Sequence, residues 1–266
     1  MVQQTRTAEF ADLDEICELT ADYRSRLAAW SPLWWSPSPD ALGAHREWIG
    51  RLLNLPVPSI WALSSPDGVD GCFAASRQST SWYVTDVGGR TADSIAAVIG
   101  ALPSTLTAMP TRVCVARADT AQAAAATERG ATVRATYWVR ATPTHIRPAP
   151  HEVAGLRSAI PMHTFGGAFD VGLEGAVVVT APDGSSMIGS PSLVAPPVYD
   201  LGGTACIAGL VEGTASRALV DAMLESAAAR GDAVLNIVVP QGDARLGELV
   251  EEAGFTPIID ALEWAA

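Results

Sequence analysis

The chain contains one sequence pattern twice, and this repeat limits the folds that it can adopt. The segment VTDVGGRTADSIAAVIG at 84–100 aligns with AGLVEGTASRALVDAML at 208–224, an offset of 124 residues. The same offset continues without a gap to a second pair of glycines, Gly130 and Gly254. A Pro-Asp-Gly turn near the start of each copy aligns at an offset of 116, and an insertion of eight residues around SLVAPPVYD in the second copy accounts for the change. Three matches in the same order predict two structurally related halves.

Each half shows the same order of secondary structure. Two strands joined by the Pro-Asp-Gly turn form a hairpin, and a strand, a tight turn, a helix, a strand, a helix and a last strand follow. This order predicts an α/β (α+β) fold in which each half is a mixed, mostly antiparallel sheet flanked by helices. We expect an N-terminal lobe at 1–141, a linker at 142–152 and a C-terminal lobe at 153–266, with the lobes related by an approximate twofold axis.

The first half opens with two further helices that the second half lacks. The segment ADLDEICELTADYRSRLAAW has apolar residues at helical spacing, and Asp12 and Glu15 have the spacing of a capping box at its start. A second helix is expected at 39–54. Only about 30 residues separate the linker from the first clear strand of the second half, so we expect the second lobe to be shortened at its start.

Charge and cysteine usage exclude several classes of protein. The net charge is −12 with only 17 Lys and Arg residues, which argues against nucleic-acid binding because that needs clustered positive charge. No run of 18 apolar residues and no signal-peptide pattern occurs, so we expect a cytoplasmic protein that does not enter a membrane. The four cysteines lie far apart in apolar stretches, and the four histidines show no metal-ligand spacing. We therefore expect buried free thiols, surface histidines and no metal site.

Together these features resemble the GNAT superfamily of acyl-CoA-dependent N-acyltransferases, in a tandem arrangement of two lobes. The opening TRTAEFADLDEICEL resembles the first strand and helix of such a domain. The segment SRALVDAMLESAAARGDAVLNIVV, with the later EEAGF, resembles its cofactor helix, the next strand and the closing Gly-Phe. The resemblance implies transfer of an acetyl group from acetyl-CoA to a small amine. It leaves open a catalytically inactive protein that binds CoA or another small molecule, a purely structural role for one lobe, and either a monomer or a homodimer.

The resemblance also places the cofactor at the turn between a strand and a helix, where backbone N–H groups and the helix dipole favour an anion. The Arg/Gln-x-x-Gly-x-Gly/Ala turn of the family is degenerate here, because Val211 and Thr214 replace its first residue and its first glycine. We expect the second-copy turn to hold the CoA pyrophosphate, with contacts from Leu210, Val211, Gly213, Thr214, Ser216 and Arg217. The first-copy turn, with Gly89 and Arg90, is the competing site, and it ranks second because Asp93 places a negative charge beside it.

Most catalytic residues of the family are replaced. Val250 and Ala126 stand four residues before the closing glycines, where many members have a Tyr general acid. Asp86, on the strand before the first-copy turn, and Tyr199, in PPVYDLGG, remain as candidates for proton transfer. Each also has a simpler interpretation, Asp86 as a solvated turn residue and Tyr199 as part of a Pro-Gly turn.

Trp34 and Trp35 lie in a loop rich in Ser and Pro, where members of the family bind their acceptor. Two adjacent tryptophans in such a loop are not expected to pack on one core face. The pair therefore predicts a wall of the acceptor site. A contact between the two halves, a lid and a hydrophobic anchor are the alternatives.

Overall fold

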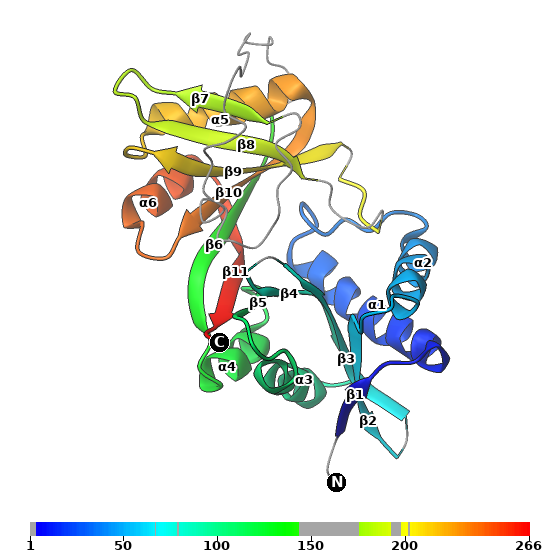
Figure 1. The fold of residues 1–266 in the computed structure, drawn as a ribbon. Coiled ribbons are helices and arrows are strands. Elements are labelled where there is room, and N and C mark those ends of the chain that lie inside the picture. The colour runs from blue at the N-terminus through cyan, green and yellow to red at the C-terminus, as the bar shows by residue number, and fades with distance from the viewer. Residues whose placement is uncertain (1–3, 67, 79, 144–175, 193–197, 202) are drawn as a thin grey trace. The chain divides into compact units, whose positions relative to one another are not determined.

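The structure is a computed structural model that describes residues 4–66, 68–78, 80–143, 176–192, 198–201 and 203–266 (Figure 1). These residues belong to two compact units. Unit 1 comprises residues up to 133 together with 195–199 and 261–266, and unit 2 comprises 134–194 and 200–260. Each unit therefore includes a segment from the other half of the sequence.

The division into lobes at 1–141 and 153–266 stays a prediction. Residues 144–175, which contain most of the predicted linker at 142–152 and most of the predicted shortened start of the second lobe, lie outside the described residues. The twofold relation between the halves also stays a prediction.

Unit 1 is built on a sheet with the strand order β1-β2-β3-β4-β5. Neighbouring strands pair antiparallel, except β4 and β5, which are parallel. The elements are β1 (Gln4–Thr7), the 3₁₀ helix η1 (Phe10–Asp12), α1 (Leu13–Trp30), α2 (Ala41–Leu53), β2 (Ile60–Ser65), β3 (Gly68–Arg77), β4 (Trp82–Gly89), α3 (Ala92–Thr105), β5 (Thr111–Ala116) and α4 (Thr120–Glu128).

Helices cover both faces of this sheet, with α1 and α2 on one face and α3 on the other (Figure 1). Two adjacent glycines at the end of β4 lie under these helices. A Cβ atom at Gly88 would lie 3.1 Å from Cγ2 of Thr20 in α1, whereas one at Gly89 would lie 2.9 Å from the backbone nitrogen of Ile95 in α3. Because side chains alternate between the faces of a strand, Asp86 lies on the same face as Gly88, beneath α1. The apolar core on this face comprises Ala8, Leu13, Ile16, Cys17, Leu19, Ile49, Ile60, Ala62, Val69, Cys72 and Ala74.

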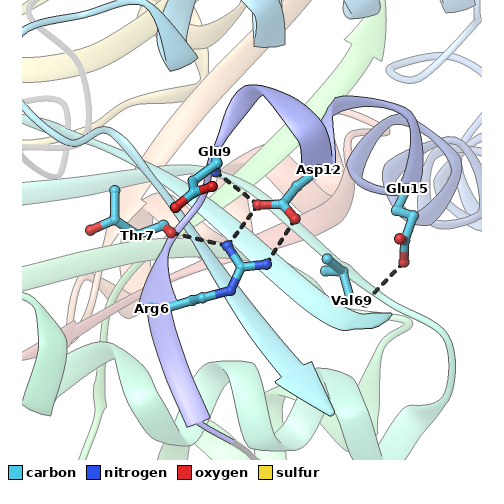
Figure 2. Close-up of polar contacts among 6 residues, drawn as sticks. All are labelled: Arg6, Thr7, Glu9, Asp12, Glu15 and Val69. Atoms are coloured by element: carbon cyan, nitrogen blue, oxygen red, sulfur yellow. Dashed lines mark hydrogen bonds and ion pairs between the residues drawn. The ribbon is translucent and has the colours of Figure 1, made fainter. Parts of the chain in front are cut away.

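The start of α1 is fixed by ion pairs rather than by the predicted capping box (Figure 2). The Arg6 guanidinium donates two hydrogen bonds of 2.7 Å to the Asp12 carboxylate, which also accepts a 2.8 Å bond from the backbone N–H of Glu9. Asp12 thus closes a box with Glu9 around η1. Glu15 instead accepts a 2.8 Å hydrogen bond from the backbone N–H of Val69 in β3. The prediction of a box between Asp12 and Glu15 is therefore wrong, because both carboxylates bind groups outside the first turn of the helix.

Unit 2 repeats the same plan. Its strands follow the order β7-β8-β9-β10-β6, with β11 beside β6. Strands β9 and β10 are parallel, and β6 pairs antiparallel with β10. The elements are β6 (Thr132–Ala141), β7 (Val177–Thr180), β8 (Ser186–Ser192), β9 (Thr204–Glu212), α5 (Arg217–Arg230), β10 (Asp232–Pro240), α6 (Ala244–Glu252) and β11 (Thr256–Trp264), whose last residues, from Ala261 on, belong to unit 1. Buried residues of β8, β9 and β10 form one apolar core with those of α5 and α6.

The repeat predicted from the sequence is confirmed in the order of the elements. The series β2, β3, β4, α3, β5, α4, β6 has its counterpart in β7, β8, β9, α5, β10, α6, β11. The described parallel pairing of β4 with β5 ends at Val84 and Val113, and that of β9 with β10 ends at Ala208 and Ile237. These two end points are equivalent at the offset of 124, so the same strands separate at the same place in both copies.

Candidate active site

The site candidate in unit 1 lies where β4 and β5 separate. Strand β4 continues to Gly89 and β5 to Ala116, but their pairing ends at Val84 and Val113. A bulge also interrupts the pairing of β4 with β3, because Ala75 is opposite Val84 and Ala74 is opposite Asp86, which leaves Thr85 as the extra residue. Bulges redirect the side chains that follow them. Both irregularities precede Asp86 directly.

Asp86 is held by a buried histidine. Its Oδ2 atom lies 3.1 Å from Nε2 of His45 in α2, and Nδ1 of the same ring lies 3.3 Å from the Thr20 hydroxyl in α1. The side chain of Asp86 is 21% exposed, whereas that of His45 is 2% exposed. The second carboxylate oxygen of Asp86 accepts no hydrogen bond from a described residue. The interpretation of Asp86 as a solvated turn residue is therefore wrong, and one of its oxygens remains available to a ligand.

The hydrogen bonds of His45 fix which ring nitrogen faces the carboxylate. The Thr20 hydroxyl lies 2.8 Å from the carbonyl oxygen of Ile16 and 3.3 Å from Nδ1 of His45, so it is placed to donate a hydrogen bond to either of these acceptors. An ionised carboxylate only accepts hydrogen bonds, so Nε2 is the donor to Asp86. Both ring nitrogens are thus satisfied inside the protein, and His45 holds Asp86 in one orientation. The prediction of surface histidines is wrong for His45, because it lies on the face of α2 that packs against α1.

Tyr199 lies in the same unit as Asp86, although the two are far apart in the sequence. Its backbone forms an isolated bridge with Pro37, and the N–H of Ser38 donates to the carbonyl of Val198 at 2.8 Å. Burial of Tyr199, and next the negative charge of Asp86, raise the pKa of its hydroxyl. This hydroxyl therefore stays protonated at neutral pH and is able to donate a hydrogen bond or a proton.

A buried tyrosine, Tyr23, lies on α1. The Tyr23 hydroxyl donates a 2.6 Å hydrogen bond to Oε1 of Gln122 in α4. Burial, and to a smaller extent the charges of Asp119 and Asp86, raise the pKa of Tyr23. Because Tyr23 already has an acceptor, it connects α1 to α4 and has a structural role in the unit.

The first-copy turn is shaped by its own side chains. Thr91 and Ser94 form a capping box at the start of α3, with the Ser94 N–H donating to the Thr91 hydroxyl oxygen at 3.1 Å. Arg90 donates from Nε to the carbonyl of Val69 and from Nη2 to Glu15, each at 3.0 Å, so its side chain lies along β3. Within the described part of the chain, the N–H groups that follow Thr91, those of Ala92 and Asp93, have no acceptor.

The second-copy turn has a backbone conformation that favours glycine. Gly213 has a φ of +75°, and a Cβ atom there would lie 2.3 Å from the Ser185 hydroxyl oxygen. That hydroxyl oxygen accepts a 3.0 Å hydrogen bond from the N–H of Thr214, so this amide already has a partner. Ser216 caps α5 by accepting from the N–H of Leu219 at 3.3 Å.

The other second-copy residues are placed less favourably for a phosphate. Arg217 donates from Nε to Asp221 at 2.9 Å and from Nη1 to the carbonyl of Glu252 at 3.3 Å, so it is engaged by α5 and α6. Leu210 and Val211 are half-buried on β9. Leu210 occupies the position equivalent to Asp86 at the offset of 124, and unit 2 therefore lacks a carboxylate at that position. The assignment of the CoA pyrophosphate to this turn stays a prediction.

Trp34 and Trp35 are both buried, with 7% and 8% of their surfaces exposed. Neither ring belongs to the apolar core beneath α1 and α2, and the expectation that the two do not pack on one core face stays a prediction. A short turn after α1 carries both, because the N–H groups of Trp34 and Trp35 donate to the carbonyl of Ser31 at 3.1 and 3.0 Å. Their predicted contact with an acceptor stays a prediction.

Other expectations concern thiols, metals and membranes. Cys17, Cys72 and Cys206 are buried free thiols as predicted, whereas Cys114 is half-buried. Burial raises the pKa of Cys206 to about 12. No group of three or more His, Cys, Asp or Glu side chains placed to bind a metal occurs among the described residues. In the same part of the chain, no helix is both long and apolar enough to cross a membrane.

Sequence comparison identifies no relatives. The sequence matches no known family profile and no curated protein. Solved structures do match. A "Putative Acetyltransferase" from Pyrococcus horikoshii has a TM-score of 0.56 at 13% identity, with 99% of this chain and 89% of that chain covered. One from Thermoplasma acidophilum has a TM-score of 0.55 at 11% identity over the whole of both chains. A GCN5-related N-acetyltransferase from Sphaerobacter thermophilus has a TM-score of 0.51 at 14% identity, covering 99% and 95%.

The protein has the GNAT fold. The likeness extends over both units, which agrees with the two-copy pattern of the sequence. At these identities it establishes the fold and assigns no role to any residue. The sequence indicated Asp86 and Tyr199 as candidates, whose roles stay predictions, but it did not indicate the contacts of His45 with Asp86 and Thr20. The signal for His45 is its position four residues before the buried Ile49, on the apolar face of α2.

Proposed function

We propose that the protein is an acyl-CoA-dependent N-acyltransferase that transfers an acetyl group from acetyl-CoA to a small amine in unit 1. The observation that carries this proposal is the carboxylate of Asp86, oriented by His45 at the point where β4 and β5 separate. A GNAT fold supplies the class of reaction by analogy, and the polar groups at this point supply the chemistry. The equivalent position in unit 2 is the apolar Leu210, so the reaction is assigned to unit 1.

The reaction requires a neutral amine beside the thioester. Asp86 accepts the proton that the ammonium loses and releases it to solvent; the neutral amine nitrogen then attacks the thioester carbonyl carbon and gives its second surplus proton to Asp86. The new C–N bond forms as the C–S bond breaks, and the CoA thiolate takes a proton from the Tyr199 hydroxyl. The proton on Asp86 then returns to Tyr199, which leaves the protein unchanged and gives an amide and free CoA.

The residues have separate tasks in this scheme. Asp86 and Tyr199 act on the reacting atoms, whereas His45 is a positioning residue because both of its ring nitrogens are engaged within the protein. Backbone N–H groups of β4 beyond Val84 have no partner on β5 in the described pairing. Such groups are suited to hold the thioester carbonyl and to stabilise the oxyanion as it forms.

The pyrophosphate of CoA is assigned to the first-copy turn because this turn lies in the same unit as Asp86. The N–H groups of Ala92 and Asp93 are directed outward at the start of α3, and this turn directly follows the strand that carries Asp86. The second-copy turn at 211–217 is the second candidate, because the N–H groups of Arg217 and Ala218 likewise have no acceptor in the described residues. If CoA binds only there, the protein is a CoA-binding module whose reacting groups lie elsewhere.

Calorimetry with CoA and two matched variants separates these assignments. Ala92→Glu and Ala218→Glu each place a carboxylate in the first turn of one helix, at an exposed alanine. A negative charge there stabilises a helix, so a loss of CoA binding would not come from unfolding. We expect Ala92→Glu to weaken CoA binding by at least about 10-fold, as loss of charge-assisted bonds implies, and Ala218→Glu to leave it unchanged. The reverse result assigns CoA to unit 2. No heat from wild type at millimolar CoA contradicts the proposed function.

A further inference from the structure

Arg24 is a buried arginine to which no described residue offers a hydrogen-bond acceptor. It lies on α1, one turn after Thr20, with 7% of its surface exposed. Its Nη1 atom is fully buried and has no hydrogen-bond partner. No described residue accepts a hydrogen bond from any other nitrogen of this guanidinium either.

Three other partly buried arginines of the described chain have acidic partners, whereas Arg140 donates to the carbonyl of Ala253 and Arg26 lies over the Tyr23 ring. Arg6 binds Asp12, Arg112 binds Glu263 at 2.5 Å, and Arg230 binds Asp232 at 2.6 Å. A guanidinium stays charged in proteins, and burying a charge without a partner is costly. The guanidinium of Arg24 is therefore placed to bind an anion that none of the described residues supplies.

The surroundings of Arg24 place this anion in the candidate active site. The charge of Arg24 acts on the Tyr199 hydroxyl and on the Cys17 thiol, and the charge of Asp86 acts on the same two groups. Thr20, which binds His45, precedes Arg24 by one helical turn on the same buried face of α1. One positive and one negative side chain thus act on the same two groups of unit 1.

We propose that Arg24 binds a carboxylate of the acceptor, so that the acceptor is an amine that also carries a carboxylate, as a free amino acid does. This inference rests on the proposed function and names its substrate class. The amine meets Asp86, and the carboxylate meets the fork of N–H donors that Arg24 presents. In the proposed function the CoA pyrophosphate lies at the turn that follows β4, beyond the end of the strand that carries Asp86, which leaves Arg24 to a second anion.

The test compares acids with their own amides. L-leucine, L-phenylalanine, L-glutamine and β-alanine are each measured against the corresponding carboxamide, by calorimetry on the protein with CoA present and by thiol release with acetyl-CoA. We expect at least one acid to bind about 10- to 100-fold more tightly than its amide, because hydrogen bonds to a charged group contribute a free energy of that size. Arg24→Met should remove that preference, with the amide affected less than about threefold. Arg51→Met, at an exposed arginine of α2, is the matched control and should change neither.

The same variant distinguishes ligand binding from a structural role. Because Arg24 has no partner in the described chain, Arg24→Met should raise the melting temperature of the free protein by about 2–4 °C, as removal of an unpaired buried charge implies. A fall of that size would make Arg24 a structural residue and overturn the inference. If Arg24→Met does not fold, the same conclusion follows, and the acid-to-amide ratio of wild type tests the substrate class independently.

The outcomes separate this inference from the proposed function. Acetyl transfer to amides as fast as to acids overturns the carboxylate site and leaves the acyltransferase. Binding of an acid that depends on Arg24, without thiol release, supports the carboxylate site and contradicts the acyltransferase. No preference for any acid by either method, or a loss of CoA affinity in Arg24→Met without acceptor present, overturns the assignment of Arg24.

Discussion

Gly89→Ala tests whether the glycine at the first-copy turn is needed for packing or for a ligand. A Cβ atom at this position would lie 2.7 Å from Cγ1 of Ile95, 2.9 Å from the backbone nitrogen of Ile95 and 2.9 Å from the Ser94 hydroxyl oxygen. The side chain of Ile95 is able to rotate, but its backbone nitrogen moves only if α3 moves on β4. Gly89→Ala should therefore shift the start of α3 relative to β4.

The magnitude follows from two opposing effects. Overpacking of this kind costs about 1–3 kcal/mol, while a glycine-to-alanine change lowers the entropy of the unfolded chain, worth about 0.4–1 kcal/mol. We expect Gly89→Ala to lower the free energy of unfolding by about 1–2 kcal/mol. Gly100→Ala, within α3, is the control. Its Cβ atom would meet nothing nearer than 3.4 Å, at the Arg129 guanidinium, so helix propensity should raise stability by about 0.5–1 kcal/mol.

Urea unfolding followed by tryptophan fluorescence and by circular dichroism measures both variants. The slope of free energy against urea should be the same for all three proteins, so that the midpoints report stability. If Gly89→Ala is as stable as wild type and loses only CoA binding, the glycine serves the approach of a ligand and the packing argument is refuted.

Two further predictions concern residues whose roles the structure changed. The Arg6 guanidinium, and next the N–H of Glu9, lower the pKa of Asp12; its stabilising effect is therefore present above the ordinary carboxyl pKa of about 4 and is lost as the pH falls through the lower folded value. Asp12→Asn should lower the free energy of unfolding by about 1–3 kcal/mol at pH 7. It should also reduce the further loss of stability that the wild type shows below pH about 4. Asp14→Asn, which removes an exposed ion pair, is the control and should have neither effect. Trp34→Ala and Trp35→Ala should each lower the free energy of unfolding by about 3–5 kcal/mol in urea titrations, and a loss of acceptor binding at unchanged stability would show instead that the rings serve a ligand.

Much of the fold could be predicted because the sequence states it twice. Both copies form the same order of strands and helices, so a strand or turn that is ambiguous in one copy is clear in the other. The turns at Gly89 and Gly213 could be predicted for that reason, and the structure also caps α4 and α6 with Asp119 and Asp243, which are equivalent at the offset of 124. Periodicity also places His45 on the buried face of α2, although its residue type suggested the surface.

The site was harder to predict because its contacts are long-range. His45 and Asp86 are 41 residues apart, and their meeting depends on how α2 packs against β4, which no local pattern encodes. Tyr199 enters unit 1 from the second half of the sequence. Arg24 lies on the buried stripe of α1 with Thr20 and Leu27, but composition gave no reason to expect a charge there without a partner.

The central claim is that Asp86 performs proton transfer during acetylation in unit 1. The most direct measurement is the rate of thiol release from acetyl-CoA, with the acid and amide panel as acceptors, for wild type, Asp86→Asn and Asp22→Asn. Asn retains the shape of Asp86 but does not accept the proton, whereas Asp22 is an exposed carboxylate elsewhere on α1. The account predicts that Asp86→Asn lowers kcat by about 10²- to 10⁴-fold at unchanged CoA affinity, while Asp22→Asn has the rate of wild type. An Asp86→Asn variant that turns over as fast as wild type would contradict it.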